Sequence, residues 1–133
     1  IAAAMRNALR EAGIGPEAID LVIPFGSGVP EIDQAEAAAL RSVLGDRLKD
    51  VPVTPIKSMA GNCGAGAAGI DLCIAAKALQ SQTIPATINC DQPLDGVCAK
   101  ATPSRSAELR HVLTYTTGLG GQNAAVVLKR FEN

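Results

Sequence analysis

The sequence predicts an α/β fold in which a mixed sheet of about five strands is flanked by helices, one of them deeply buried. Helical periodicity alternates with short β-prone runs along most of the chain, as in layered α/β domains. A glycine-rich turn from Lys57 to Gly69 leads into an apolar segment whose only charges up to Leu79 are Asp71 and Lys77. Aromatic residues make up only 2% of the chain against 47% apolar residues, so Ala, Val, Leu and Ile must form the core.

The N-terminal segment predicts an amphipathic helix. Apolar residues recur at helical spacing from Ile1 onward, and Gly13 ends the pattern. The pattern begins without an initiator Met or a capping residue, as though its first turn lay upstream. We therefore expect residues 1–133 to be one domain of a longer protein.

A strand and a second helix follow. Residues 20–24 (Asp-Leu-Val-Ile-Pro) predict a short buried strand, and a Gly/Pro-rich loop at 25–31 leaves its carboxyl end, where open α/β sheets bind ligands. Asp33 is expected to cap the next helix, which runs to about Leu44 before Gly45 ends it.

The middle of the chain carries the candidate site. Residues 51–56 predict a strand, although Pro52 and Pro55 interrupt it. This strand leads into Lys57 and the glycine-rich turn, whose glycines let the backbone pass close to a partner. The free N–H groups of the helix that follows favour anions and oxyanions. The alternative interpretation is a plain strand-to-helix turn in an α/β core, with Lys57 in a structural ion pair.

The remaining segments complete the predicted sheet. The apolar segment 65–80 predicts the deeply buried helix, in which Cys73 is expected to be a small core residue. Strands are expected at 83–88, 109–117 and 124–128, with a polar loop after the first and a glycine-rich turn joining the last two. The order βαβαβ followed by two strands predicts a mixed sheet.

Composition excludes several classes of function. The net charge is −1, which gives no reason to expect nucleic acid or an anionic membrane as a partner. No apolar run is long enough for a membrane span, and there is no signal peptide. The single histidine and the lack of CxxC spacing predict no metal site and reduced thiols in a cytoplasmic protein. The four cysteines are Cys63, Cys73, Cys90 and Cys98.

Four segments, in this order, resemble the C-terminal part of β-ketoacyl-[acyl carrier protein] synthases, which have the thiolase fold. Residues 25–30 (Phe-Gly-Ser-Gly-Val-Pro), followed by Asp33 and Glu36, match the family's His-Gly-Thr-Ser-Thr-Pro and Asp-x-x-Glu. Residues 57–62 (Lys-Ser-Met-Ala-Gly-Asn) match Lys-Ser-x-x-Gly-His. The family's Ile-Pro-Pro-Thr-Ile-Asn and Gly-Phe-Gly-Gly-Thr-Asn correspond to residues 84–89 and 118–123. The resemblance implies a single C-terminal thiolase-like domain over residues 1–133.

The resemblance also implies a chemistry. In the family, a cysteine in the N-terminal half holds an acyl chain, and the two motif histidines stabilise the enolate that forms as malonyl-carrier loses carbon dioxide. Here Phe25 stands at the first histidine position and cannot donate a hydrogen bond, whereas Asn62 at the second can. Lys57, which supports the second histidine in the family, is retained. The catalytic positions are thus Asn62, Lys57 and the degenerate Phe25, whose ring is expected to lie against Asn62 and desolvate it.

Substrate-binding positions follow from the same resemblance. Hydroxyls that contact the phosphopantetheine arm of the carrier fall on Ser27, which keeps one, and on Val29, which does not. Leu119 replaces a phenylalanine that gates the acyl pocket, and Gly120 and Gly121 complete that turn. No bound cofactor is expected, because the phosphopantetheine of an acyl carrier protein would act as a substrate arm.

Three functions remain open at this point. A non-condensing subunit like the chain-length factors of polyketide biosynthesis is favoured, because both motif histidines are replaced. An active 3-oxoacyl-[acyl carrier protein] synthase with an altered site is the second, since some relatives use a His-Asn pair. The third makes Cys63 a nucleophile at a helix N-terminus, with His111 as its base.

Expected partners are the N-terminal half of the same protein, a second subunit in a homodimer or heterodimer, and an acyl carrier protein. The chain alone is not expected to be active.

Overall fold

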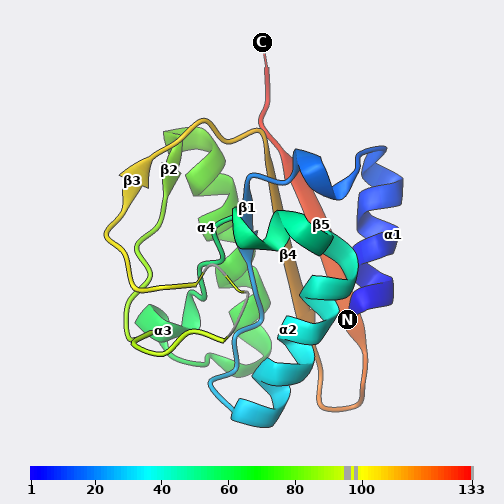
Figure 1. Ribbon diagram of the computed structural model, residues 1–133, viewed down its shortest axis with the longest axis vertical. Helices are drawn as coiled ribbons and strands as arrows, with labels where there is room; N and C mark the ends of the chain where they lie inside the picture. Colours follow the sequence, from blue (N-terminus) through cyan, green and yellow to red (C-terminus); the bar gives the residue numbers. More distant parts are fainter. Residues whose placement is uncertain (95–96, 98, 133) are drawn as a thin grey trace.

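The computed structural model describes residues 1–94, 97 and 99–132, and its centre is a three-stranded sheet with helices on both faces (Figure 1). The strand order is β1-β4-β5, with β1 at Leu21–Ile23, β4 at His111–Thr117 and β5 at Asn123–Lys129. β1 runs parallel to β4, with Val22 opposite Leu113, and β5 runs antiparallel to β4. The sheet is therefore mixed, as the sequence predicted.

The described chain contains five strands, but they form two sheets rather than one. β2 (Thr83–Ile84) and β3 (Arg105–Ser106) pair with each other in a short antiparallel ribbon beside the main sheet. The expected strand at 83–88 therefore ends after Ile84, apart from a single bridge between Thr87 and Thr102.

The strand expected at 51–56 is also reduced to one bridge. Val53 pairs with Val22 at the free edge of β1, and the flanking backbone bonds run from Val22 N to Pro52 O and from Thr54 N to Val22 O, each 2.9 Å long. The next bonds of a parallel ladder would need an N–H from Pro52 on one side and from Pro24 on the other, and neither proline has one, so the ladder cannot extend in either direction. The predicted mixed α/β fold is confirmed, but the five described strands divide into a three-stranded and a two-stranded sheet.

The first two helices end where the sequence predicted. α1 spans Ala2–Ala12, and its C-cap Gly13 has φ 67°, a left-handed conformation that glycine adopts without steric cost. α2 spans Pro30–Leu44 and ends at Gly45. It begins at Pro30 rather than at Asp33, because proline fits the first turn of a helix. Asp33 lies inside that turn and has a different role, described below.

The glycine-rich region forms a short helix, a turn and a long helix. α3 spans Lys57–Ala60, and α4 spans Ala67–Ser81. Three 3-10 turns complete the elements: η1 (Pro16–Ala18), η2 (Gly45–Lys49) and η3 (Gly64–Gly66).

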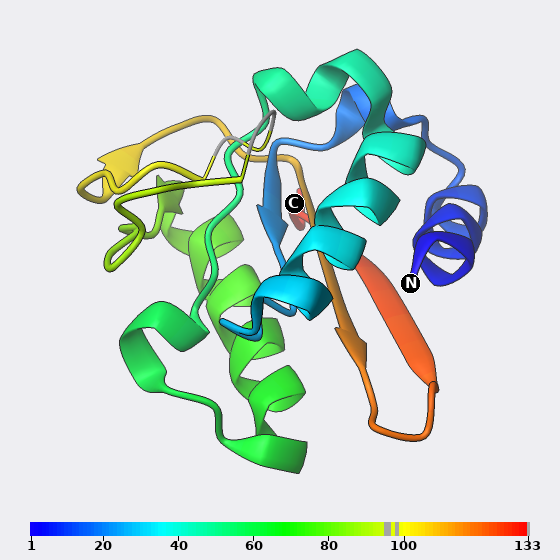
Figure 2. The same ribbon diagram turned by 60° about the horizontal axis from the view of Figure 1, so that its bottom comes forward.

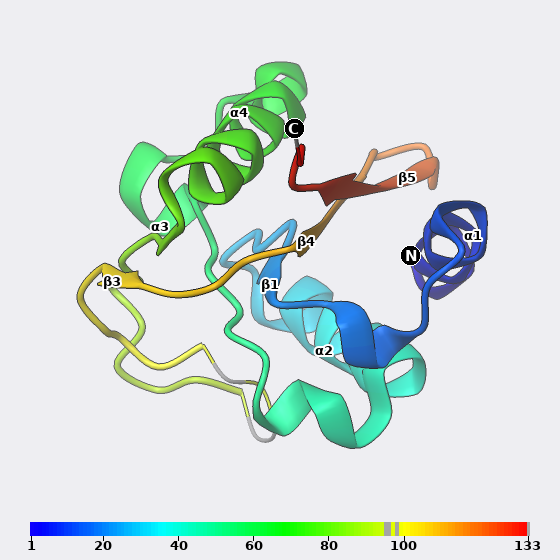
Figure 3. The same cartoon turned by 90° about the horizontal axis from the view of Figure 1, so that it is seen from above.

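Each face of the sheet has its own apolar core. α1 and α2 cover one face and α4 covers the other, as the view from above shows (Figure 3). Successive residues of a strand point to opposite faces, so Val22 and Leu113 pack with α1 and α2, whereas Ile23 and Val112 pack with α4. This alternation explains why β1 and β4 are apolar throughout.

α4 is buried along one face only, so the prediction of a deeply buried helix is wrong within this chain. Its buried side consists of Ala67, Asp71, Ala75, Ala78 and Leu79. On the opposite side Leu72 keeps 37% of its surface exposed, and Cys73 is exposed rather than a core residue. The apolar composition of α4 predicts that most of its surface packs against protein. Within the described chain, only one side of the helix does so.

The described helices are all too short or too polar to cross a membrane. Cys63, Cys73 and Cys90 are free thiols, and the expectation for Cys98 lies outside the described residues.

Candidate functional site

The loop after β1, the short helix α3 and the start of α4 lie together at one end of the molecule (Figure 2). β1 ends at Ile23, and Phe25 follows two residues later. Lys57 opens α3, which follows directly from the segment that bridges to β1 through Val53. Phe25 and Lys57 therefore lie at the carboxyl end of a parallel strand, the location that α/β sheets favour for ligands.

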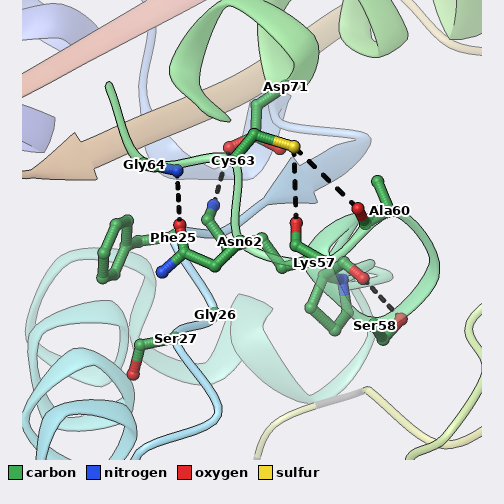
Figure 4. A network of polar contacts seen from close by, with 12 residues as sticks. Phe25, Gly26, Ser27, Lys57, Ser58, Ala60, Asn62, Cys63, Gly64 and Asp71 are labelled. Atoms are coloured by element: carbon green, nitrogen blue, oxygen red, sulfur yellow. Dashed lines mark hydrogen bonds and ion pairs between the residues drawn. The ribbon is translucent and has the colours of Figure 1, made fainter. Parts of the chain in front are cut away.

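Lys57 is the centre of a buried charge cluster. Its Nζ lies 3.0 Å from Oδ2 of Asp71 in α4, and the two side chains are only 6% and 3% exposed. The same Nζ lies 4.7 Å from the centroid of the Phe25 ring, which is a cation–π distance (Figure 4). Burial raises the pKa of Asp71, while the Lys57 ammonium works against that rise. The ion pair considered as an alternative for Lys57 is thus present.

Asn62 sits in the turn between α3 and η3 and is exposed to solvent. Its Oδ1 accepts a hydrogen bond of 3.0 Å from Gly64 N (Figure 4). Asn62 is exposed, so the expectation that it is desolvated is wrong within this chain. The expected proximity of Phe25 to Lys57 is present, with the ring centroid 4.7 Å from Nζ.

Two carboxylates of α2 hold the loop that carries Phe25. Glu36 accepts hydrogen bonds from Phe25 N at 2.7 Å and from Gly26 N at 3.0 Å. Asp33 accepts from Ser27 N at 2.9 Å and from Gly28 N at 3.1 Å. Residues three apart on a helix share a face, so one side of α2 satisfies four consecutive backbone amides. We call residues 25–28 the clamped loop.

Sequence reasoning missed this arrangement. Asp33 was expected to cap α2, and Glu36 was noted only as part of a motif. The available signal was a pair of acids three residues apart in the first half of a helix, directly behind a loop rich in glycine. Carboxylates accept hydrogen bonds only, so a buried acid such as Glu36, which is 4% exposed, must find donors nearby.

The Tyr115 side chain completes the buried surroundings of Glu36. Burial raises the pKa of Glu36, and the Tyr115 hydroxyl and the amides of Gly26 and Phe25 hold the rise in check. Burial raises the pKa of Tyr115 well above its ordinary value of 10.0, and the charge of Glu36 adds to the rise. The hydroxyl forms no hydrogen bond of regular geometry among the described residues.

The raised pKa of Tyr115 leads to a testable prediction about the stability of the fold at alkaline pH. Its pKa is higher in the folded than in the unfolded chain, so its contribution to stability is complete below pH 10.0 and is lost as the pH rises through the folded value. Tyr115 is the only tyrosine of the chain, so phenolate absorbance reports it directly. We expect no phenolate signal above pH 10.0 until the circular dichroism of the fold is lost, and then one joint transition.

The matched control for this experiment is Tyr115→Phe. That variant should show no phenolate signal, and its unfolding free energy should fall less steeply in alkali. A phenolate signal that develops smoothly near pH 10.0 in a chain with native circular dichroism would contradict the prediction.

The substrate-binding positions are spread over two places. Ser27 Oγ donates to Asp33 Oδ1 at 2.8 Å and accepts from Val29 N at 3.0 Å, so this hydroxyl also holds the loop. Val29 is 44% exposed. Leu119, Gly120 and Gly121 form the tip of the β4–β5 hairpin, where Leu119 is fully exposed.

The Cys63 hypothesis loses its base in this structure. The Cys63 thiol is exposed and faces the carbonyls of Ala60 and Gly61 at 3.9 and 4.0 Å (Figure 4). His111 starts β4 at the opposite end of the sheet, and its Nδ1 lies 3.2 Å from Ala18 O. In the part of the chain that the structure describes, no cluster of three metal-ligating side chains occurs.

Comparison with known proteins gives a consistent result. Residues 1–91 match the family model "Beta-ketoacyl synthase, C-terminal domain". The chain is 34% identical over 128 residues to 3-oxoacyl-[acyl-carrier-protein] synthase 2 of Coxiella burnetii, covering 95% of this chain and 31% of that protein. It is 37% identical over 131 residues to the tetracenomycin polyketide synthase ketoacyl synthase beta subunit of Streptomyces glaucescens, covering 97% of this chain and 32% of that protein.

The solved structures agree with the sequence relatives. The ishigamide ketosynthase/chain length factor superimposes with a TM-score of 0.88 at 30% identity, covering 99% of this chain and 33% of that one. The chain therefore spans about a third of the length of the relatives that it matches.

Proposed function

We propose, from the premise that this chain belongs to the β-ketoacyl synthase family, that the protein carrying it is a non-condensing subunit of the chain-length-factor type in fatty acid or polyketide biosynthesis. The family predicted from the motifs is confirmed by the match over residues 1–91. The observation that carries the finer proposal is the Phe25 ring, which stands at the first histidine position and lies 4.7 Å from the Lys57 amine. A phenyl ring has no hydrogen to donate to an oxyanion, so the first donor of the family's chemistry is missing.

The state of Lys57 supports the same conclusion. In the family this lysine supports the second motif histidine, but here its ammonium is paired with Asp71 and covered by an aromatic ring. Both partners are almost fully buried, so the cluster stabilises the junction of α3 and α4 and offers no donor to a substrate. The loop and helix that carry the site are kept, whereas the hydrogen-bond donors are replaced. This combination is expected of a subunit that shapes the acyl pocket of a partner ketosynthase and does not catalyse condensation itself.

Two of the relatives support this choice by their names. One is a ketoacyl synthase beta subunit, and another is a ketosynthase/chain length factor. We propose by analogy that the protein pairs with a ketosynthase subunit and meets an acyl carrier protein, whose phosphopantetheine arm is a substrate arm. The exposed side of α4, with Leu72 at its centre, would pack against the rest of the polypeptide.

The test is decarboxylation of malonyl-carrier by the full-length protein without a partner subunit. We expect carbon dioxide release roughly a hundred- to a thousandfold slower than by a condensing synthase under the same conditions, because one oxyanion donor is absent. Turnover at about one per second or more, which is typical of enzymes, would overturn the proposal. A cysteine at the nucleophile position of the full-length protein would also weaken it, whereas a glutamine or alanine would support it.

An active synthase with an altered site is the second candidate, and Asn62 is the observation in its favour. Its side chain is exposed, and only Oδ1 is engaged among the described hydrogen bonds, which leaves the amide Nδ2 able to donate to a substrate. The 34% identity to a 3-oxoacyl-[acyl-carrier-protein] synthase 2 agrees with that role. The decarboxylation assay separates the two candidates, since only an active synthase turns over malonyl-carrier.

A further inference from the structure

The clamped loop is held by two carboxylates that act on different residues. Glu36 binds the amides of Phe25 and Gly26, whereas Asp33 binds those of Ser27 and Gly28. The bond from Phe25 N is 2.7 Å long, as expected for an amide that donates to an ionised carboxylate. The position of the Phe25 backbone is therefore fixed by Glu36, not by Asp33.

The Phe25 backbone in turn determines where its ring lies. The ring extends from this anchored residue over Nζ of Lys57, while Asp71 pairs with the same nitrogen at 3.0 Å (Figure 4). The Lys57 side chain is 6% exposed as a result. Glu36 on α2 is thus connected through a single residue to the amine at the start of α3.

We infer that Glu36 is a positioning residue whose carboxylate holds the Phe25 ring over Lys57 and so keeps the Lys57 amine closed to ligands. This inference rests on the proposed function, in which the Phe25 ring occupies the place of an oxyanion donor. Beyond that proposal, we infer that the ring covers Lys57 because Glu36 of α2 holds the loop, and not because of the phenylalanine alone.

Glu36→Gln is the informative substitution, because it keeps the size of the side chain and removes its charge. A carboxylate offers two acceptor oxygens, whereas an amide offers one acceptor and one donor. In the structure Oε1 of Glu36 accepts from Phe25 N at 2.7 Å and from Gly26 N at 3.3 Å, and Oε2 accepts from Gly26 N at 3.0 Å. In the variant an NH₂ group must replace one of these oxygens, so at least one bond is lost and every bond that remains loses its charge assistance. The loop then samples positions in which the ring leaves Lys57.

The experiment measures acetylation of Lys57 by an amine-reactive ester in the full-length protein, followed by peptide mass spectrometry. We expect Lys57 in the Glu36→Gln variant to react roughly ten- to a hundredfold faster than in the unsubstituted protein, the range that loss of charge-assisted hydrogen bonds implies. Lys77, which is exposed on α4, serves as an internal standard whose rate should stay constant. The matched control Asp33→Asn weakens the same loop at Ser27 and Gly28, and Lys57 should remain slow.

Two further variants test the route of the effect. Phe25→Ala should expose Lys57 at least as much as Glu36→Gln, and combining the two changes should give no further rise, because Glu36 acts through the ring. A Lys57 rate that is unchanged in Glu36→Gln but raised in Phe25→Ala would overturn the inference and leave the proposed function intact. Equal acceleration in Asp33→Asn and Glu36→Gln would also overturn it, since loop loosening in general would then suffice.

Glu36→Asp keeps the inference testable if Glu36→Gln does not fold. The shorter carboxylate retains the charge but cannot reach the Phe25 amide at the same distance, so an intermediate Lys57 rate is expected. A rate equal to that of the unsubstituted protein would contradict the positioning role. The decarboxylation assay tests the proposed function separately, because it does not depend on the reactivity of Lys57.

Discussion

Replacing both Phe25 and Asn62 with histidine should raise the rate at which the full-length protein decarboxylates malonyl-carrier. The expected increase is roughly a hundred- to a thousandfold. Each oxyanion donor in an enclosed site typically contributes a factor of this size. The Phe25→His change would bring a ring N–H to the loop after β1, and the Asn62→His change would bring a second to the turn after α3. Both donors would then face the oxygen on which the enolate charge develops. Carbon dioxide release from labelled malonyl-carrier measures the effect.

The single changes and a donor-free control show whether hydrogen bonding is the cause. Either single histidine should restore less than the pair, and the effects need not add, because both donors act on one oxygen. Phe25→Leu with Asn62→Leu adds no donor and keeps an apolar side chain beside Lys57, and it should leave the rate at background. Equal acceleration by the leucine pair would show that hydrogen bonding from the added histidines is not the cause.

Asp71→Asn should lower the free energy of unfolding by about 3–5 kcal/mol, the range found when one partner of a buried ion pair is removed. The substitution preserves the shape of the side chain but leaves the Lys57 ammonium without a counter-charge in a site where its side chain is only 6% exposed. The Phe25 ring offers some compensation through its π face, but it cannot replace a full negative charge. Chemical denaturation of the folded protein measures the change.

The chain provides its own matched control for this prediction. Asp46 pairs with Lys49 at 2.7 Å, but both side chains are largely exposed, so Asp46→Asn should hardly change the midpoint of denaturation. Replacing both buried partners, as in Lys57→Met with Asp71→Leu, should destabilise less than Asp71→Asn alone, since no charge is then left unpaired. An Asp71→Asn midpoint no lower than that of Asp46→Asn would contradict the buried-pair interpretation.

The elements that local sequence determines were predicted well. α1 was recognised from its apolar spacing and its terminal Gly13, and the β4–β5 hairpin from two β-prone runs joined by glycines. These features depend on neighbours in the sequence, which a pattern records directly.

The elements that failed depend on partners distant in the sequence. Residues 51–56 are β-prone, yet only Val53 pairs with β1. The extent of this pairing depends on the partner strand, which a local sequence pattern does not identify. α4 is apolar around most of its circumference, but composition cannot say which part of that surface meets the rest of this chain. Cys73 was therefore assigned to the core although it lies on the exposed side.

The contacts of the candidate site could be predicted only in part. The motifs placed Phe25, Lys57 and Asn62 together, whereas the structure adds Asp71, which lies fourteen residues after Lys57 and pairs with it. The signal was available, since Asp71 is the only acid in the apolar helix and a buried acid requires a counter-charge or donors. The position of the Phe25 ring over Lys57 could not be predicted, because it depends on the clamped loop and on the side of α2 that faces it.

The parallel pairing of β1 with β4 has a consequence for how the chain is synthesised. Val22 pairs with Leu113, and the Asp20 carboxylate accepts from the amides of Arg110 and His111, ninety and ninety-one residues later. Contacts this distant in sequence close a long loop before they contribute stability. Translation delivers the N-terminus first, so β1 leaves the ribosome well before β4 exists and can pair only through the single bridge to Val53 until the β4–β5 hairpin has emerged. A nascent chain stalled before β4 should thus bind chaperones, whereas one released after β5 should not.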